Sequence, residues 1–270
     1  MRMTPAVKNL LIINVLFFAA AIVMQRSLNI DLDTYLGLHY VSARDFGLWQ
    51  FVTFMFMHAN ISHIFFNMFA LWMFGTAVED ALGTKRFVAY YMACGIGSGI
   101  IQELAVGFDL RPMIAAVDTL LNDPTTANIQ DFLTTTVRVV SVESQQAITQ
   151  FVSSYNSIAA TDPGAAASMA RDFAMKYQEL YVNANVTVGA SGAVFGILLA
   201  FGMIFPNLRI MLLFPPIPMK AKWFVLVYGL LELFGGIHGS DYDNVAHWAH
   251  LGGMLFGFVL LRLWNIRRLN

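Results

Sequence analysis

The chain has little charge and almost no cysteine, and both shortages narrow what it can be. Only 12% of its 270 residues are charged, whereas a soluble domain carries roughly 25%. The single cysteine, Cys94, excludes an internal disulfide framework and a cysteine metal cluster. The formal net charge of −1 argues against a nucleic-acid-binding surface. Together these shortages favour a membrane protein.

Three sequence patterns are also missing. No His-Glu-x-x-His element is present, which disfavours a zinc protease. The first apolar run ends at Met24-Gln25-Arg26 without a small-residue cleavage site, so we expect a retained first span rather than a signal peptide. No internal repeat is visible, which disfavours a transporter, because transporters commonly place broken helices in paired halves.

Apolar residues are what the chain has in abundance. They make up 57% of it, and several runs reach the roughly 20 residues that cross a bilayer. We therefore predict an all-α polytopic membrane protein with six transmembrane helices. The predicted spans cover residues 6–25, 55–76, 86–104, 187–205, 221–238 and 245–264.

The basic residues of the short loops predict the orientation. If six spans alternate in direction, most loop lysines and arginines fall on one side, which is then cytoplasmic. Both termini are expected on that side. These cations are Arg2, Lys8, Lys85, Arg86, Arg209, Lys220, Lys222, Arg267 and Arg268.

Two longer segments lie on the opposite, extracytoplasmic side. Residues 26–54 mix aromatic and charged side chains, which suits an interfacial segment at the lipid headgroups. Residues 105–186 are polar and long for a connection inside a bundle. We expect an insertion between spans three and four that is a helical hairpin or partly disordered, with or without a function. Its helix-like stretches are 127–156 and 165–181, the second preceded by Asp162 and Pro163 as helix-start residues.

Three predicted spans carry polar residues at the same outer depth. His58, His63 and Asn67 lie in span two, Ser191 begins span four, and His250 lies in span six. An ionisable side chain inside a membrane is costly and marks a functional-site hypothesis. Small residues let helix backbones approach closely, so we expect spans four and six to touch and Ser191 Oγ to reach His250. The small residues are Gly192, Gly196, Ala200, Gly253 and Gly257.

A serine beside a histidine is the minimum equipment for acyl transfer. His250 would accept the Ser191 proton and later return it to the leaving amine. Asn67, His63 and backbone N–H groups near Ser191 would supply donors for the oxyanion. No carboxylate stands in an obvious third position, so we predict a dyad in which helix packing orients the imidazole.

This array resembles the rhomboid family of intramembrane serine proteases, over about 45–104 and 187–264. The main matching elements are Gly189-Ala190-Ser191-Gly192-Ala193-Val194-Phe195-Gly196, His63-Ile64-Phe65-Phe66-Asn67, and Ala249-His250-x-x-Gly253-x-x-x-Gly257. Further similar stretches are Gly75-Thr76-Ala77-Val78-Glu79, Ser98-Gly99-x-x-Gln102 and Glu232-Leu233-Phe234-Gly235. Two features depart from the family: Gln50 after Trp49, where many relatives carry arginine, and the length of the 105–186 insertion.

The resemblance implies a rhomboid-like bundle in which 1–104 and 187–270 form one domain. It implies a serine endopeptidase that cuts single-span membrane proteins near the outer face of a bilayer, expected to be a bacterial inner (plasma) membrane. No metal or other cofactor and no nucleic-acid partner is expected, and the oligomeric state is left open. The implied site residues are Ser191 and His250 as the dyad, His63 and Asn67 as oxyanion donors, and His58, Phe195, Gly189 and Gly192 as supporting residues.

Other interpretations stay open at this point. Histidines 58, 63, 247 and 250 are a second candidate site, for a metal ion. A rhomboid-like protein that binds membrane helices without cutting them is a third possibility, which loss of either dyad residue would favour. We expect His247 to be a bundle or interfacial residue and Glu232 to be structural, with a contribution of either to catalysis left open. The insertion is expected to gate or select substrates, if it has a function.

Overall fold

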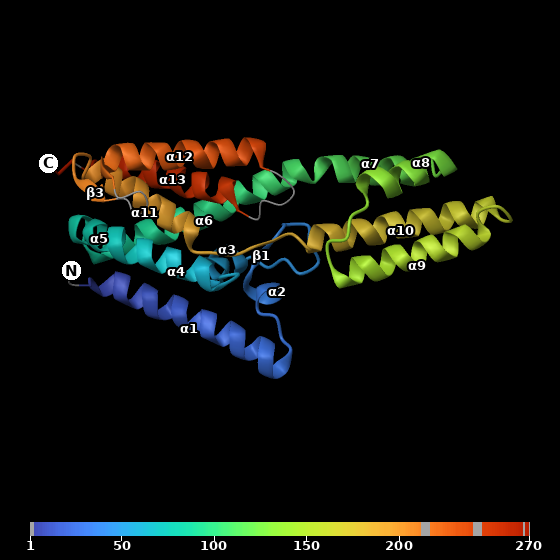
Figure 1. Cartoon of the computed structure of the whole chain (residues 1–270), viewed down its shortest axis with the longest axis horizontal. Helices are drawn as coiled ribbons and strands as arrows, with labels where there is room; N and C mark the ends of the chain where they lie inside the picture. Colours follow the sequence, from blue (N-terminus) through green and yellow to red (C-terminus); the bar gives the residue numbers. More distant parts are fainter. Residues whose placement is uncertain (1–2, 212–216, 240–244, 267, 270) are drawn as a thin grey trace. The chain divides into compact units, whose positions relative to one another are not determined.

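The computed structural model describes residues 3–211, 217–239, 245–266 and 268–269, and it is mostly helical (Figure 1). The chain forms two compact units. The bundle unit contains residues 1–38, 47–104 and 187–270, and the insertion unit contains residues 39–46 and 105–186. Two of the predicted loop cations, Arg2 and Arg267, lie outside the described residues.

Long apolar helices build the bundle unit. Three described helices are long and apolar enough to cross a membrane: Pro5–Leu28, Ile61–Leu82 and Thr84–Asp109. The shorter Ser191–Ile204 is also apolar. In order, the helices are α1 (Pro5–Leu28), α4 (Ile61–Ala70), the π-helical η2 (Leu71–Gly75), α5 (Thr76–Leu82), α6 (Thr84–Asp109), α11 (Ser191–Ile204), α12 (Ala221–His238) and α13 (His247–Leu263). The total of six spans stays a prediction.

Short elements connect these helices. The antiparallel strands β3 and β4 pair Arg209 with Lys220, Ile210 with Met219 and Met211 with Pro218. The chain passes between the two units four times: at the short strands β1 and β2, between residues 46 and 47, and within α6. The short elements are α2 (Asp33–Leu36), β1 (Leu38–His39), α3 (Gln50–Thr53), the 3-10 helix η1 (Phe54–Phe56), β2 (Val186–Thr187), β3 (Arg209–Met211) and β4 (Pro218–Lys220).

The second membrane helix begins later than the sequence predicted. The prediction started it at residue 55, but residues 54–56 form a 3-10 turn and α4 starts at Ile61. Asn60 explains the difference, because its side-chain oxygen accepts the His63 backbone N–H at 2.8 Å and caps the helix. His58 therefore lies in the irregular segment before α4 rather than inside that helix.

A buried carboxylate fixes the start of α1. Glu79, in the middle of α5, accepts the backbone N–H groups of Ala6 and Val7 at 3.0 and 2.9 Å. The Thr84 hydroxyl donates to the same carboxylate at 2.8 Å. The first N–H groups of a helix have no partner within the helix, so Glu79 supplies partners for two of them. Glu79 therefore has a structural role, which is to hold the start of α1.

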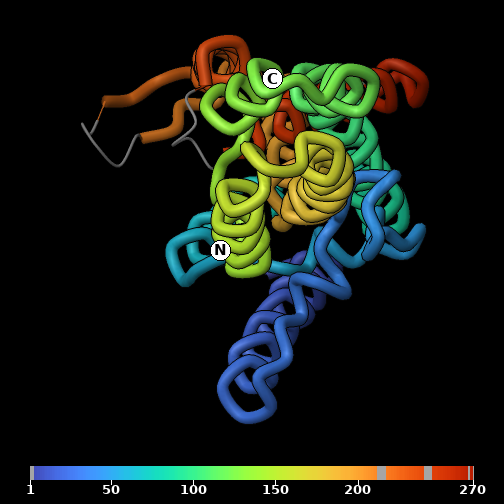
Figure 2. Tube along the Cα trace, turned by 90° about the vertical axis from the view of Figure 1, so that its right-hand side faces the viewer, coloured from blue at the N-terminus to red at the C-terminus, as the bar shows by residue number. Residues whose placement is uncertain are grey.

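The insertion unit is a helical bundle with its own aromatic core. Figure 2 shows α9 and α10 side by side, as their contacts require. Phe151 of α9 stacks on Phe173 of α10 at 4.2 Å, and Tyr177 is fully buried. The helices are α7 (Arg111–Asn122), α8 (Thr126–Asp131), the π-helical η3 (Phe132–Thr136), α9 (Val142–Ile158) and α10 (Pro163–Asn183).

Helix caps in this unit agree with the sequence prediction at one place and differ at another. Asp162 accepts the Ala165 N–H at 2.9 Å and Pro163 is the first residue of α10, as predicted. The predicted helix over 127–156 is instead broken, because a capping box between Ser141 and Ser144 starts a new helix.

Candidate active site

The turn before α11 depends on a glycine. Gly189 has φ +134°, a conformation that side-chain-bearing residues rarely adopt. Its N–H donates to the Phe54 carbonyl at 2.9 Å, which fixes the turn. A Cβ at this position would lie 2.8 Å from Cε1 of the His63 ring and 3.5 Å from Ser191 Oγ. The turn therefore brings the His63 ring and the Ser191 hydroxyl to the same glycine.

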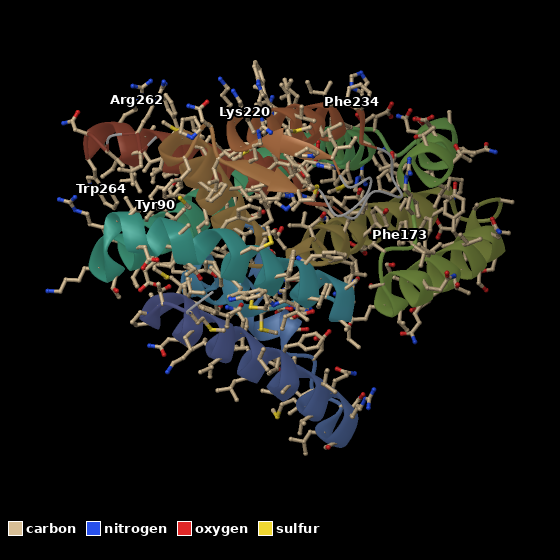
Figure 3. All side chains as sticks on the ribbon, turned by 60° about the vertical axis from the view of Figure 1, so that its left-hand side comes forward. Tyr90, Phe173, Lys220, Phe234, Arg262 and Trp264 are labelled. Atoms are coloured by element: carbon tan, nitrogen blue, oxygen red, sulfur yellow. The ribbon has the colours of Figure 1, made fainter. Side chains whose placement is uncertain are left out.

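Helices α11 and α13 pack backbone against backbone. A Cβ on Gly253 would collide with the Gly192 carbonyl, and one on Gly196 would lie 3.1 Å from the Gly253 carbonyl. The predicted contact between small-residue stripes of spans four and six is confirmed. From α6, the Tyr90 hydroxyl donates to the Gly196 carbonyl at 2.8 Å, and its ring lies near Trp264 (Figure 3).

This close packing brings Ser191 and His250 together. Ser191 Oγ lies 2.8 Å from His250 Nε2, a hydrogen-bond distance. The His250 ring is buried and stacks on Phe195, with ring centroids 4.1 Å apart and planes 8° apart. Phe195 therefore covers one face of the His250 imidazole, and the hydrogen bond joins the edge of that ring to Ser191.

A carboxylate that the sequence analysis treated as structural contacts the same imidazole. Glu232 Oε2 lies 2.8 Å from His250 Nδ1 and 2.6 Å from His247 Nδ1. The prediction that no carboxylate occupies a third position behind the histidine is therefore wrong. The Glu232-Leu233-Phe234-Gly235 stretch was noted, but the rotation of α12 about its axis decides where Glu232 lies, and sequence spacing does not reveal it.

The remaining predicted site residues each make a contact near the serine. The His58 ring meets the His63 ring edge-on, with centroids 5.1 Å apart. Asn67 is buried, and its side-chain amide donates to the His63 carbonyl one helical turn away, at 3.0 Å. Gly192 packs against the Ala249 carbonyl oxygen, which would lie only 3.2 Å from a Cβ added to Gly192. An amide has two N–H donors, so the bond to His63 leaves Asn67 a donor for a ligand.

Glu232, His247 and His250 also have the donor types of a metal site. Their ligand atoms lie within 4.8 Å of one another. Tetrahedral zinc holds nitrogen and oxygen ligands at about 2.0–2.2 Å, which separates neighbouring ligand atoms by roughly 3.3–3.5 Å. The 2.6 and 2.8 Å separations around Glu232 Oε2 are instead those of hydrogen bonds. The cluster is therefore best described as a hydrogen-bonded carboxylate.

Comparison with known proteins identifies the class. The sequence profile of the family described as Rhomboid domain matches residues 45–110 and 133–265. Because this is more than half of the chain, the protein belongs to the rhomboid family. Family membership and the long apolar helices make it an integral membrane protein.

Individual relatives match over shorter stretches. Rhomboid protease GluP of Bacillus subtilis (strain 168) is 44% identical over 52 residues, which cover 19% of this chain and 10% of the relative. Rhomboid protease GlpG of Salmonella choleraesuis (strain SC-B67) is 34% identical over 58 residues, covering 22% of this chain and 21% of the relative. GlpG of Salmonella newport (strain SL254) matches to the same extent, 34% over 58 residues. The chain thus spans a tenth to a fifth of the length of these relatives.

Proposed function

We propose that the protein is an intramembrane serine endopeptidase that uses Ser191 as nucleophile and His250 as general base. The observation that carries this proposal is the 2.8 Å hydrogen bond between Ser191 Oγ and His250 Nε2, formed by two helices in contact. A nucleophile within hydrogen-bond reach of a base is the signature of covalent catalysis. Membership of a family whose relatives are named rhomboid proteases supports the same conclusion.

The reaction proceeds through an acyl-enzyme. Ser191 Oγ attacks the carbonyl carbon of the scissile peptide bond while its proton passes to His250 Nε2. The tetrahedral intermediate collapses, the carbon–nitrogen bond breaks, and His250 returns the proton to the leaving amine. A water molecule then gives a proton to His250 and attacks the ester carbonyl carbon. The bond from that carbon to Ser191 Oγ breaks, His250 returns the proton to Oγ, and the new carboxyl end is released.

The oxyanion formed in each step needs donors about 2.7–3.1 Å away. We assign this role to His63, Asn67 and backbone N–H groups at the start of α11. The His63 ring and Ser191 Oγ both lie next to Gly189, which supports His63 as a hydrogen-bond donor to an oxyanion beside the nucleophile. Four residues support these groups: His58 against the His63 ring, Phe195 under His250, and Gly189 and Gly192 through close backbone packing.

We extend the proposal to the substrate and the setting. The substrates are single-span membrane proteins cut near the outer face, in a bacterial inner membrane, with the lipid bilayer as the other partner. Residues 1–104 and 187–270 form one rhomboid domain with both termini cytoplasmic and with 26–54 at the interface. Residues 105–186 are an extracytoplasmic insertion. The chemistry assigned to Ser191 and His250 requires no cofactor.

The first experiment is a cleavage assay in liposomes with a generic single-span substrate and a fluorophosphonate probe. We expect wild type to cut and to be labelled, and Ser191→Ala and His250→Ala to lose both while still inserting. His63→Ala and Asn67→Ala should each lower the rate by about 10- to 1,000-fold, since each removes one oxyanion donor.

Three results would contradict the proposal. Full cleavage by Ser191→Ala would remove the serine mechanism. Loss of wild-type cleavage on adding a chelator, reversed by zinc, would instead indicate a metalloprotease built on the histidine cluster. An inserted wild type that neither cuts nor reacts with the probe would favour the helix-binding interpretation.

A further inference from the structure

The imidazole of His250 is bonded at both nitrogens. Its Nε2 meets Ser191 Oγ at 2.8 Å and its Nδ1 meets Glu232 Oε2 at 2.8 Å. We propose that Glu232, held in place by His247, is a positioning residue that fixes the tautomer and orientation of His250 for its work as general base. This inference rests on the proposed protease function and adds a positioning residue behind its pair of catalytic residues.

The hydrogen inventory of these groups leads to one arrangement. An ionised carboxylate only accepts hydrogen bonds, so the hydrogen between Glu232 and His250 must be on Nδ1. A neutral imidazole carries one N–H, so Nε2 then presents a lone pair to the Ser191 hydroxyl. The opposite tautomer would direct an N–H at Ser191 and could not accept its proton. The bond to Glu232 thus selects the form that a serine protease needs.

His247 holds the carboxylate from a second side. Its Nδ1 lies 2.6 Å from Glu232 Oε2, so one oxygen accepts two N–H groups. Gly235, three residues along α12, makes room for this ring, since a Cβ there would lie 2.5 Å from Cε1 of His247. A buried carboxylate with two donors has little freedom to move, and it passes that constraint to His250.

Packing alone does not supply the same selection. Phe195 stacks on His250 at 4.1 Å and fixes the plane of the ring. A stacked ring can still flip by 180° or exchange tautomers without losing that contact. Only a directional acceptor at Nδ1 distinguishes these states, and Glu232 is the group found there.

The test uses the full chain in liposomes and two independent readouts. Nitrogen-15 NMR of histidine-labelled protein reports which ring nitrogen of His250 carries the hydrogen, with His250→Gln to assign the signal. Steady-state cleavage of a single-span substrate gives kcat and KM. The variants are Glu232→Leu, Glu232→Gln and His247→Gln. Glu79→Gln is the matched control, because Glu79 is a buried carboxylate whose hydrogen bonds run to the Ala6 and Val7 N–H groups at the start of α1 and to the Thr84 hydroxyl.

We expect wild-type His250 to carry its hydrogen on Nδ1. Glu232→Leu should move the hydrogen to Nε2 and lower kcat by roughly 10- to 100-fold with little change in KM. Compared with Glu232→Leu, Glu232→Gln should restore part of the hydrogen on Nδ1 and part of kcat, because its amide oxygen still accepts the Nδ1–H of His250. His247→Gln should have a smaller effect in the same direction, and it keeps the test decisive if the leucine variant does not fold. Glu79→Gln should leave the tautomer and kcat unchanged.

An unchanged tautomer in Glu232→Leu would overturn the positioning role, even if kcat fell, because a packing defect alone gives that result. A different outcome separates this inference from the function on which it rests. If Glu232 controls the tautomer but wild type neither cuts nor reacts with a fluorophosphonate, the positioning of the imidazole is supported and the protease function fails.

Discussion

At the scale of single residues, Gly189 is required both for its backbone conformation and for the space that it leaves beside His63. Its φ of +134° disfavours any side chain, and a Cβ would also press on His63 at 2.8 Å. Gly83 has φ +76° but open space around the Cβ position. The two glycines therefore separate the effect of backbone strain from the effect of crowding at the site.

We expect Gly189→Ala to lower the rate of fluorophosphonate labelling at Ser191 by tenfold or more, because the methyl group displaces the His63 ring. Gly83→Ala should cost about 1–3 kcal/mol in stability from strain and label normally once folded. Thermal unfolding in detergent measures the stability, and fluorophosphonate labelling of the folded fraction measures the reactivity of Ser191. Equal labelling of the two variants would show that crowding at residue 189 is harmless.

The sequence predicted Ser191 and His250 because each stands out in an apolar run next to glycines that allow close packing. It failed at Glu232, and the reason is physical. A residue on a membrane helix faces its partner only after the helix has been rotated and tilted by its neighbours, and α12 carries its acid on a helix that is apolar on most sides. The contact between Glu232 and His250 is therefore a property of packing.

At the scale of elements, α11 and α13 are in contact through main-chain atoms. A Cβ on Gly253 would lie 2.6 Å from the Gly192 carbonyl carbon, and a backbone cannot yield as a side chain can. Gly229 of α12 faces α13 differently, since its Cβ would meet only the flexible end of Met254 at 3.1 Å. The helix ends were less predictable than the helices, as the start of α4 at Ile61 shows, because a single cap such as Asn60 decides them.

We predict that Gly253→Ala destabilises the bundle unit by about 1–3 kcal/mol, the usual cost of overpacking. It should also lower cleavage at least tenfold by separating His250 from Ser191. Gly229→Ala is the control and should change neither the stability nor the cleavage rate by much. Unfolding in mixed detergent micelles and the cleavage assay measure the two effects, and normal cleavage by Gly253→Ala would mean that the helices tolerate separation.

At the scale of the whole molecule, the chain builds two cores from different chemistry. The bundle unit relies on glycine contacts and a few buried polar bonds, whereas the insertion unit relies on stacked aromatic rings such as Phe151 and Phe173. Composition revealed that residues 105–186 differ from the spans. It could not reveal that residues 39–46 belong with them, because that association depends on contacts such as the 2.8 Å bond from Asn183 to Asp45.

Phe173→Ala should destabilise the insertion unit by about 3–5 kcal/mol, the usual cost of removing a core phenylalanine. Labelling of Ser191 by fluorophosphonate should remain at the wild-type rate, because the site lies within the bundle unit. Hydrogen exchange followed peptide by peptide would show faster exchange in the insertion unit alone. Val142→Ala, at a residue 76% exposed, is the control. Faster exchange throughout the bundle unit would contradict the independence of the two cores.

The contact between α11 and α13 also bears on when the protein becomes active during its synthesis. Ser191 leaves the ribosome well before His250, and α12 must be made between them. A nascent chain that has released α11 but not α13 holds a serine without a base and a row of glycines without a partner. Under the proposed mechanism, cleavage of neighbouring membrane proteins cannot begin until α13 has been made and has closed against α11.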